Sequence, residues 1–338
     1  MDAPRRSAWL QWVLRAVPAL ALLAWSFHLA LPRGEDGHVA WSALVDAIEA
    51  PPAEATFWVV ACFALFGATL AAGALRFHLL MRAARVPSRF GSSLHVFLVA
   101  IFFNAVLPGG VVGDAWRVWQ GHDRMRMGPT VLGVVTLERI LGLQALGIVS
   151  LCGAPWVPLG DMPRTVLAGL VAVASGCAFG PFLLLHPVAA RAMRAIVERL
   201  PARFARVKRV TLEAGDGLIA VRGDPARAAA AIGLSLMCQA IPVVAVWTLA
   251  QPLAGEVAAP WFAVVVPFVT LASMLPISLG GTGVRELLFV SLFGRVGMPA
   301  VAALTLGLGT GLVNLAWAGV GLVLFLVDDH RDADPPTT

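Results

Sequence analysis

Residues 94–114 read LHVFLVAIFFNAVLPGGVVGD: 14 mainly apolar residues that end at Leu107, then Pro108-Gly109-Gly110, and soon afterwards the charged Asp114. A transmembrane helix needs about 20 apolar residues, so the apolar run is too short to cross a bilayer by itself. Proline and glycine then interrupt the helix. Irregular backbone at membrane depth is tolerated only where protein or a water-filled cavity satisfies its polar groups. The stretch therefore predicts a re-entrant segment that turns back inside the membrane.

The composition of the whole chain also indicates a membrane protein. Of its 338 residues, 59% are apolar and 13% are charged, which is about half the charged share of soluble domains. This composition excludes an ordinary water-soluble enzyme, and the small net charge of +5 in short loops suits lipid headgroups better than nucleic acid. We expect no metal and no cofactor, because the histidines and cysteines lack ligand spacing.

Eight uncharged stretches follow one another along the chain. They cover residues 16–32, 55–75, 90–113, 140–160, 165–190, 228–255, 257–284 and 296–327. The loop after the first stretch is acidic, whereas the connection after the second carries four arginines and no acid: Arg76, Arg82, Arg85 and Arg89. The connection 187–227 has nine basic and four acidic residues. Because cytoplasmic loops are rich in Lys and Arg, we expect the first loop outside and both basic connections inside.

These two cytoplasmic connections fix the number of crossings between them. An even number of crossings must separate Arg89 from Arg191, yet three uncharged stretches lie between them, so the shortest, 94–107, is expected to turn back. Arg5 and Arg6 precede the first stretch and no A-x-A cleavage site follows it. We therefore expect an uncleaved first helix with its N-terminus in the cytoplasm.

A second break has the same order of residues as the first. Residues 275–286 read LPISLGGTGVRE, so each break has Leu-Pro, then Gly-Gly, then a further Gly and a charge. If the second break is also re-entrant, it enters from outside, and the two halves are inverted repeats, a design common in transporters. The alternative is a complete crossing by 258–279 that puts Arg285 and Arg295 inside. Charge counting favours the complete crossing, and symmetry favours the inverted repeat.

The expected fold is an all-α polytopic membrane protein with about six full transmembrane helices and two re-entrant helical hairpins related as an inverted repeat. Eight crossings, or seven with one re-entrant hairpin, are the alternatives. We expect a single integral membrane domain over residues 1–327 and a short polar tail over 328–338. The domain would comprise a first repeat at 55–160, the cytoplasmic basic connection at 187–227 and a second repeat at 228–327. With six crossings the C-terminus is also cytoplasmic.

Each break brings backbone donors and an arginine together. A helix that starts after a break points free N–H groups and the positive end of its dipole at an anion. We expect Asp114 and Arg117 one turn apart after the first break, and Thr282 as the N-cap before Arg285 and Glu286 after the second. Guanidinium groups bind phosphate through two hydrogen bonds, so these breaks suit an anionic headgroup. The alternative is that the glycines only allow close packing and that Asp114 and Arg117 only pair with each other.

Glu138 and Arg139 interrupt an apolar segment two to three helical turns from its cytoplasmic end. Ionisable residues at membrane depth are costly and usually face a cavity or a partner. Neighbouring helix positions point about 100° apart, so these two cannot simply pair with each other. We expect their partners elsewhere, and Arg285 and Glu286 supply the complementary charges. If the helix instead begins near Ile140, the pair lies at the headgroups.

The candidate residues for a headgroup path combine the two breaks with this pair. They are Asn104, Pro108, Gly109, Gly110, Asp114, Arg117, Glu138, Arg139, Pro276, Gly280, Gly281, Gly283, Arg285 and Glu286. Asn104 is included because it precedes Pro108 by four residues and can satisfy the interrupted backbone. The G-x-x-x-G patterns at 176–180 and 307–311 are interpreted as helix packing.

The two breaks, 104–110 and 275–286, together with Glu138-Arg139, resemble the flippase-like transmembrane family. Its best-known relative is the membrane part of lysylphosphatidylglycerol synthase, the multiple peptide resistance factor. The similarity runs from about Val17 to Val327, and the second motif is the more specific. The resemblance implies a multi-pass inner-membrane protein that binds and translocates lipids or lipid-linked molecules. Because the chain ends eleven residues after Val327, we expect no aminoacyl-transferase domain and no lipid lysinylation.

The function expected is therefore a lipid flippase of the cell inner (plasma) membrane that acts on anionic lipids or lipid-linked phosphates. We expect no enzymatic activity, because the sequence has no arranged nucleophile and base and no nucleotide-binding loop. One alternative is a non-transporting partner that presents lipid to a separate synthase or transferase. Another is an ion-coupled carrier of a small soluble solute.

Overall fold

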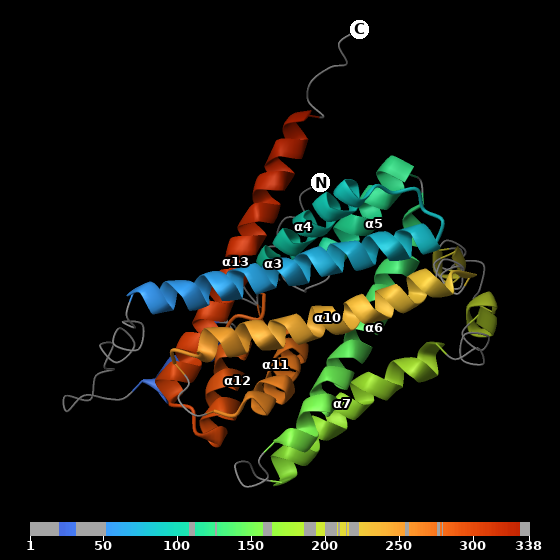
Figure 1. The fold of residues 1–338 in the computed structure, drawn as a ribbon. Coiled ribbons are helices and arrows are strands. Elements are labelled where there is room, and N and C mark those ends of the chain that lie inside the picture. The colour runs from blue at the N-terminus through green and yellow to red at the C-terminus, as the bar shows by residue number, and fades with distance from the viewer. Residues whose placement is uncertain are drawn as a thin grey trace, which may run out of the picture.

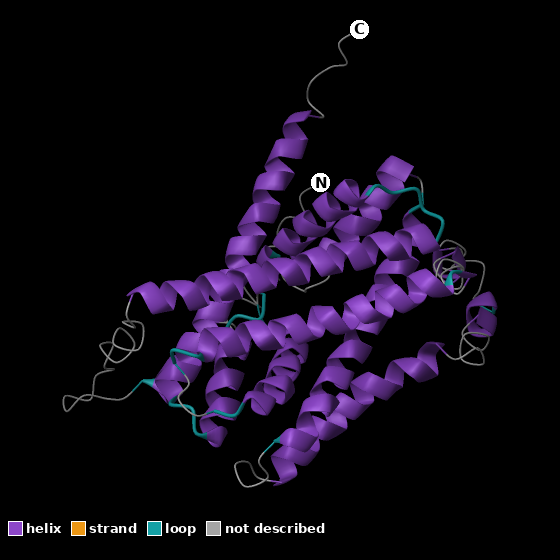
Figure 2. Ribbon diagram, in the orientation of Figure 1, coloured by secondary structure: helices purple, strands orange, loops and turns teal. Residues whose placement is uncertain are grey.

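The computed structural model describes residues 20–31, 52–107, 112–125, 127–157, 164–185, 194–199, 208, 210–213, 215, 223–253, 257–275, 278 and 280–331. All regular secondary structure in these ranges is helical (Figure 2). By length and composition, four helices can cross a membrane: Thr56–Ala83, Gly128–Trp156, Pro225–Ala250 and Ala300–Val327. Shorter apolar helices accompany them. The prediction of an all-α polytopic membrane protein is confirmed.

The helices follow the same order of lengths in each half of the chain. In the first half, α3 (Pro52–Ala83) is followed by the short α4 (Phe90–Val106) and α5 (Val112–Met125) and then by the long α6 (Gly128–Gly153). In the second half, α10 (Pro225–Ala250) is followed by the short α11 (Ala259–Ser273) and α12 (Val284–Phe293) and then by α13 (Ala300–Arg331). Between the halves lie the 3₁₀ turn η1 (Ala154–Trp156) and α7 (Arg164–Leu185), and a second 3₁₀ turn, η4 (Gly294–Val296), precedes α13.

The first break turns the chain back on itself. The backbone N–H of Gly113 donates to the Oδ1 of Asn104 at 2.9 Å, so the amide satisfies the interrupted backbone as the sequence predicts. A Cβ added to Gly113 would lie 2.1 Å from the carbonyl oxygen of Ala100, so only glycine allows α5 to lie this close to α4. The 17 residues of α4 and 14 of α5 span about 25 and 21 Å. Each is shorter than the hydrocarbon core of about 30 Å.

The second break is built from glycines with left-handed backbone. Gly280, Gly281 and Gly283 have φ angles of 55°, 81° and 86°, which L side chains rarely adopt. The N-cap of α12 is Gly283, so the prediction that Thr282 is the N-cap is wrong. A Cβ added to Gly280 would lie 2.9 Å from the carbonyl oxygen of Ala105. The second break therefore lies directly against the end of α4, beside the first break.

The two halves pack on each other in a reciprocal pattern. The helices α3 and α10 lie side by side and run in opposite directions (Figure 1). Outside this pair, α4 of the first half packs on α13, and its counterpart α11 packs on α6. Likewise α5 packs on α6, and α12 packs on α13. Reciprocal contacts of this kind are the mark of two units related by a two-fold axis, and antiparallel counterparts are what inverted repeats require.

Of the two G-x-x-x-G patterns, one lies at a close contact. A Cβ added to Gly307 would lie 3.1 Å from the Cα of Glu286, and one added to Gly311 would lie 2.2 Å from the Nη2 of Arg285. These two glycines thus let the first turn of α12 dock on α13. The packing prediction is wrong for Gly176, since none of the described atoms lies within 4 Å of a Cβ placed there.

Candidate functional site

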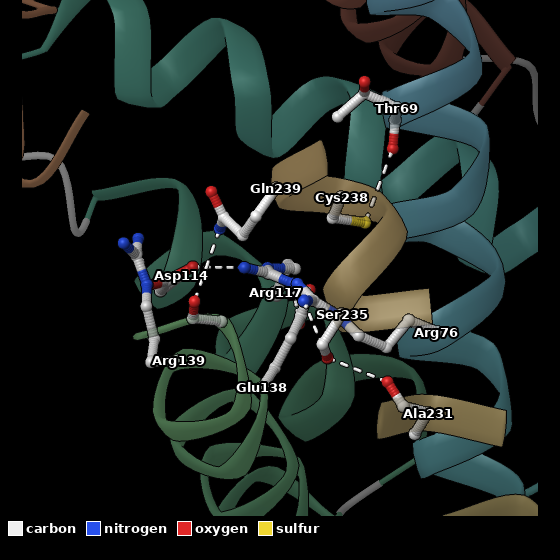
Figure 3. Close-up of polar contacts among 11 residues, drawn as sticks. Thr69, Arg76, Asp114, Arg117, Glu138, Arg139, Ala231, Ser235, Cys238 and Gln239 are labelled. Atoms are coloured by element: carbon white, nitrogen blue, oxygen red, sulfur yellow. Dashed lines mark hydrogen bonds and ion pairs between the residues drawn. The ribbon is translucent and has the colours of Figure 1, made fainter. Parts of the chain in front are cut away.

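Five charged residues alternate in sign through the interior of the first half (Figure 3). In order they are Arg76, Glu138, Arg117, Asp114 and Arg139, and we call them the charge chain. Arg76 comes from α3, Asp114 and Arg117 from α5, and Glu138 and Arg139 from α6. Three positive and two negative charges leave the charge chain with one net positive charge.

Glu138 is the centre of the charge chain. Its side chain is 4% exposed, and each carboxylate oxygen accepts from a different arginine: Oε1 from Arg76 at 2.7 Å and Oε2 from Arg117 at 2.6 Å. Arg76 also donates to the hydroxyl of Ser235 on α10 at 3.1 Å. One carboxylate therefore connects α6 to α3 and α5, and Arg76 extends the connection to α10. Nearby, Gln239 of α10 donates to the carbonyl of Gly142 on α6 at 3.4 Å.

Arg117 is held by charges and by aromatic rings. Besides Glu138 it donates to Asp114, three residues earlier in α5. Its guanidinium carbon lies 5.1 Å from the centre of the Phe77 ring and 5.3 Å from that of Phe97. Both distances are within the range of cation–π attraction. Arg117 is therefore fixed in place by groups from three other helices as well as its own.

The charge chain opens towards the surface at Arg139. The Nε and Nη2 of Arg139 each lie 2.7 Å from the Oδ2 of Asp114. The side chain of Asp114 is 13% exposed and that of Arg139 is 38% exposed, against 10% for Arg76 at the other end. The charge chain is thus closed at Arg76 and accessible at Arg139.

A groove of about 690 Å³ runs between α5 and α6 from this accessible end. Asp114 and Arg139 form its polar end, and its walls are otherwise mainly apolar, with Val118, Trp119 and Leu132 among them. The volume lies within the range of small-molecule sites, about 300–1,000 Å³. We call it the α5–α6 groove.

At the second break, Arg285 and Glu286 form a local pair that is separate from the charge chain. Arg285 donates to Glu286 at 2.6 Å through Nη2 and to the carbonyl of Gly307 at 3.0 Å through Nε. The other Glu286 oxygen accepts from the backbone N–H of Gly283 at 2.6 Å, which caps the start of α12. Glu286 is 1% exposed. This pair therefore fastens the second break to α13.

The structure corrects the predicted partners of Glu138 and Arg139. Glu138 pairs with Arg76 and Arg117, and Arg139 pairs with Asp114, whereas Arg285 pairs with its neighbour Glu286. The reason is that α5 packs on α6, whereas α12 packs on α13. The alternative in which the helix begins near Ile140 is also wrong, because α6 begins at Gly128.

Arg76 is the member of the charge chain that the sequence interpretation missed. The charge pattern assigns it to the loop charges that set the topology, but it is buried inside α3, which continues to Ala83. The signal was present, because the apolar residues Phe77, Leu79 and Leu80 follow it directly. Of the predicted path residues, Pro108, Gly109, Gly110 and Pro276 lie outside the described residues.

Comparison of the chain with curated proteins gave no match, and comparison with solved structures gave none either. The family model described as "Lysylphosphatidylglycerol synthase TM region" matches residues 9–321, which is most of the chain. The motifs that carried the resemblance, both breaks and the Glu138-Arg139 pair, lie inside this range. The protein is a member of the lysylphosphatidylglycerol synthase TM region family.

Proposed function

We propose that the protein moves a lipid or lipid-linked molecule between the two leaflets by guiding its anionic headgroup along the charge chain. The family takes its description from the membrane region of a lipid synthase, which supports a role for this protein in lipid handling. The observation that carries the proposal is the rise in side-chain exposure from 4% at Glu138 to 38% at Arg139. Charges buried at one end and accessible at the other give an anion a place to enter.

In the proposed exchange, Arg139 keeps an anionic partner throughout. A phosphate that reaches Arg139 takes the place of Asp114 on the guanidinium, so the arginine passes from one anion to another. Guanidinium binds carboxylate and phosphate with the same two-pronged geometry. Because a buried charge without a partner is costly, this exchange is easier than entry of the headgroup into an uncharged interior. The net positive charge of the charge chain favours an anion further.

The second break supplies the other side of the proposed path. Gly280 lies against Ala105 at the end of α4, so the two breaks adjoin. We propose that Arg285 and Glu286, together with Gly283 at the start of α12, form a second polar binding site for the headgroup. The acyl chains remain in the surrounding lipid, and the driving force is a gradient or the distribution of the lipid itself.

A leaflet-resolved assay in proteoliposomes tests the proposal. Fluorescent phosphatidylglycerol is reconstituted with the protein, and dithionite quenches only the fluorophores of the outer leaflet. Hydrogen bonds to charged groups contribute about 1.5–3 kcal/mol, so Arg139→Ala is expected to slow translocation about tenfold or more. The double variant with Arg285→Ala is expected to be slower still.

The matched control is Arg82→Ala, because Arg82 is an exposed arginine in the last turn of α3. It is expected to translocate at the wild-type rate. A folded double variant with wild-type translocation would refute the proposal. Absence of translocation by the wild-type protein, together with stable co-purification of a separate synthase, would support the lipid-presenting alternative instead.

A further inference from the structure

The α5–α6 groove has a polar end and an apolar body. On α5 the lining positions include 114, 115, 118 and 119, and on α6 they are 132, 135, 136 and 139. Both sets have the spacing of a single helix face, so the groove is a continuous strip between two neighbouring helices. Its charges, Asp114 and Arg139, are confined to one end. A site with this distribution is matched to a molecule that is itself polar at one end and apolar along the rest.

We infer that the α5–α6 groove holds the hydrocarbon chain of one anionic lipid whose phosphate lies on Arg139. This inference rests on the proposed function and adds to it a binding site for the hydrocarbon chain of the lipid. The charges favour an anion, because the charge chain carries one net positive charge and its accessible end is an arginine. The apolar walls select an amphiphile over a soluble phosphate, since Val118, Leu132 and Val135 offer a small soluble solute no polar partner.

The dimensions of the groove fit the part of a lipid chain next to the headgroup. From Arg139 back to Leu132 the groove follows α6 for seven residues, about 10 Å. Leu132 lies four residues from the start of α6, so the groove covers about a third of the hydrocarbon core and the rest of the lipid chain leaves it sideways into the surrounding lipid. Arg139 itself lies eleven residues into α6, about 16 Å from its start. With the start of α6 at the cytoplasmic surface, as the charge count predicts, a phosphate on Arg139 lies deeper than the headgroups of either leaflet, as expected of a lipid in transit.

Trp119 closes the apolar part of the groove on the α5 side. Trp119 is 51% exposed, and the centre of its ring lies 5.0 Å from the centre of the Trp116 ring. The Trp116 ring in turn packs against Phe103 of α4 and Phe325 of α13, with ring centres 5.1 Å and 5.5 Å away. The wall that faces the lipid chain is thus supported by rings from two other helices. A rigid aromatic wall gives a chain a large contact surface at little entropic cost.

Photo-cross-linking tests the inference directly. The probe is phosphatidylglycerol with a diazirine on its acyl chain close to the glycerol, reconstituted with the full chain. Phosphatidylcholine with the same diazirine chain serves as the comparison lipid. We expect adducts on residues 115–119 and 132–136 that form at least fivefold more with phosphatidylglycerol. Arg139→Gln is expected to remove this headgroup preference. Equal labelling by both lipids, or adducts spread evenly over exposed positions of α13 such as Leu312 and Leu315, would overturn the inference.

Two substitutions fill the groove from opposite walls without touching its charges. Ala115 on α5 and Thr136 on α6 are both exposed and line the groove. Ala115→Trp and Thr136→Trp are each expected to reduce the groove adducts at least fivefold. The matched control is Ala71→Trp, at an exposed position of α3 that does not line the groove. It is expected to leave the adducts unchanged, and full adduct yield in both filled variants would also overturn the inference.

Measuring translocation on the same preparations separates the two proposals. If wild-type protein translocates phosphatidylglycerol without headgroup-dependent adducts in the groove, the groove inference fails and the proposed function stands. If the adducts form with the expected preference but the wild-type protein does not translocate, the groove inference stands and the proposed translocation fails. Loss of both adducts and translocation in the filled variants, with both retained in Ala71→Trp, supports the two together.

Discussion

At the scale of single residues, Glu138 is a buried carboxylate that joins three helices through two arginines. Arg76 and Arg117 share the one buried carboxylate of Glu138. Within the charge chain it is the only carboxylate that pairs with Arg76, whereas Arg117 also pairs with Asp114. Removal of one partner of a buried ion pair leaves a charge without compensation in a medium of low polarity. The stability of this region should therefore depend strongly on Glu138.

Glu138→Ala is expected to lower the free energy of unfolding by about 3–5 kcal/mol. The cost comes from Arg76 and Arg117, which would remain buried without their shared carboxylate. Chemical unfolding in detergent micelles measures the effect. The control is Glu198→Ala, since Glu198 pairs with Arg194 at 3.1 Å but its side chain is 51% exposed. That exposed pair is expected to change stability by at most about 0.5 kcal/mol, and similar losses in both variants would contradict the prediction.

At the scale of elements, the first hairpin depends on a close approach between two helices. Gly113 brings the start of α5 against the carbonyl of Ala100 on α4, and Asn104 accepts its N–H. This contact sets the position of the next turn of α5, from which Asp114 and Arg117 reach the charge chain. The geometry of the site therefore rests on the absence of a side chain at Gly113.

Gly113→Ala is expected to lower the free energy of unfolding by about 1–3 kcal/mol, because the added methyl group forces α5 away from α4. Thermal unfolding in detergent measures the change. Gly91→Ala, near the start of α4, is the control, since no described atom lies within 4 Å of a Cβ placed there. Alanine is the better helix former by up to about 1 kcal/mol, so the control is expected to be neutral or stabilising. Destabilisation by both substitutions to the same degree would argue against the close approach.

At the scale of the whole molecule, the antiparallel pair α3 and α10 sets the relation of the two halves. Thr69 and Cys238 meet at one point of this pair, and Arg76 and Ser235 meet at another. As the residue number rises along α3 it falls along α10, so the two helices run in opposite directions. Opposite directions of the two corresponding helices are what an inverted repeat requires.

Cysteine accessibility tests this arrangement in the membrane. In a background without the four native cysteines, single cysteines replace the exposed residues Arg85 at the end of α3, Gly223 before α10, Thr56 at the start of α3 and Gln251 after α10. A membrane-impermeant maleimide is expected to reach Arg85→Cys and Gly223→Cys from one side only, the cytoplasmic side according to the charge count. Thr56→Cys and Gln251→Cys are expected to react from the other side. Labelling of Arg85→Cys and Gly223→Cys from opposite sides would rule out the antiparallel crossing.

The sequence by itself determined the class of the protein, the location of both breaks and the helical setting of Glu138 and Arg139. These features depend on local properties: a run of apolar residues, a helix-breaking proline or glycine, a charge in an apolar segment. The link from Gly113 to Asn104 was also predictable, because the two residues are close in sequence.

Only the tertiary structure decided which charges meet. Arg76 and Glu138 are 62 residues apart, and their pairing depends on how α3 and α6 are rotated and packed, which no local pattern records. For the same reason the sequence alone places Arg76 among the loop charges and offers Arg285 and Glu286 as partners of Glu138 and Arg139, whose partners lie on α3 and α5. The α5–α6 groove likewise exists only where two helix faces come together. Hydropathy and helix breakers act within a segment, whereas ion pairs and grooves depend on the relative orientation of segments far apart in sequence.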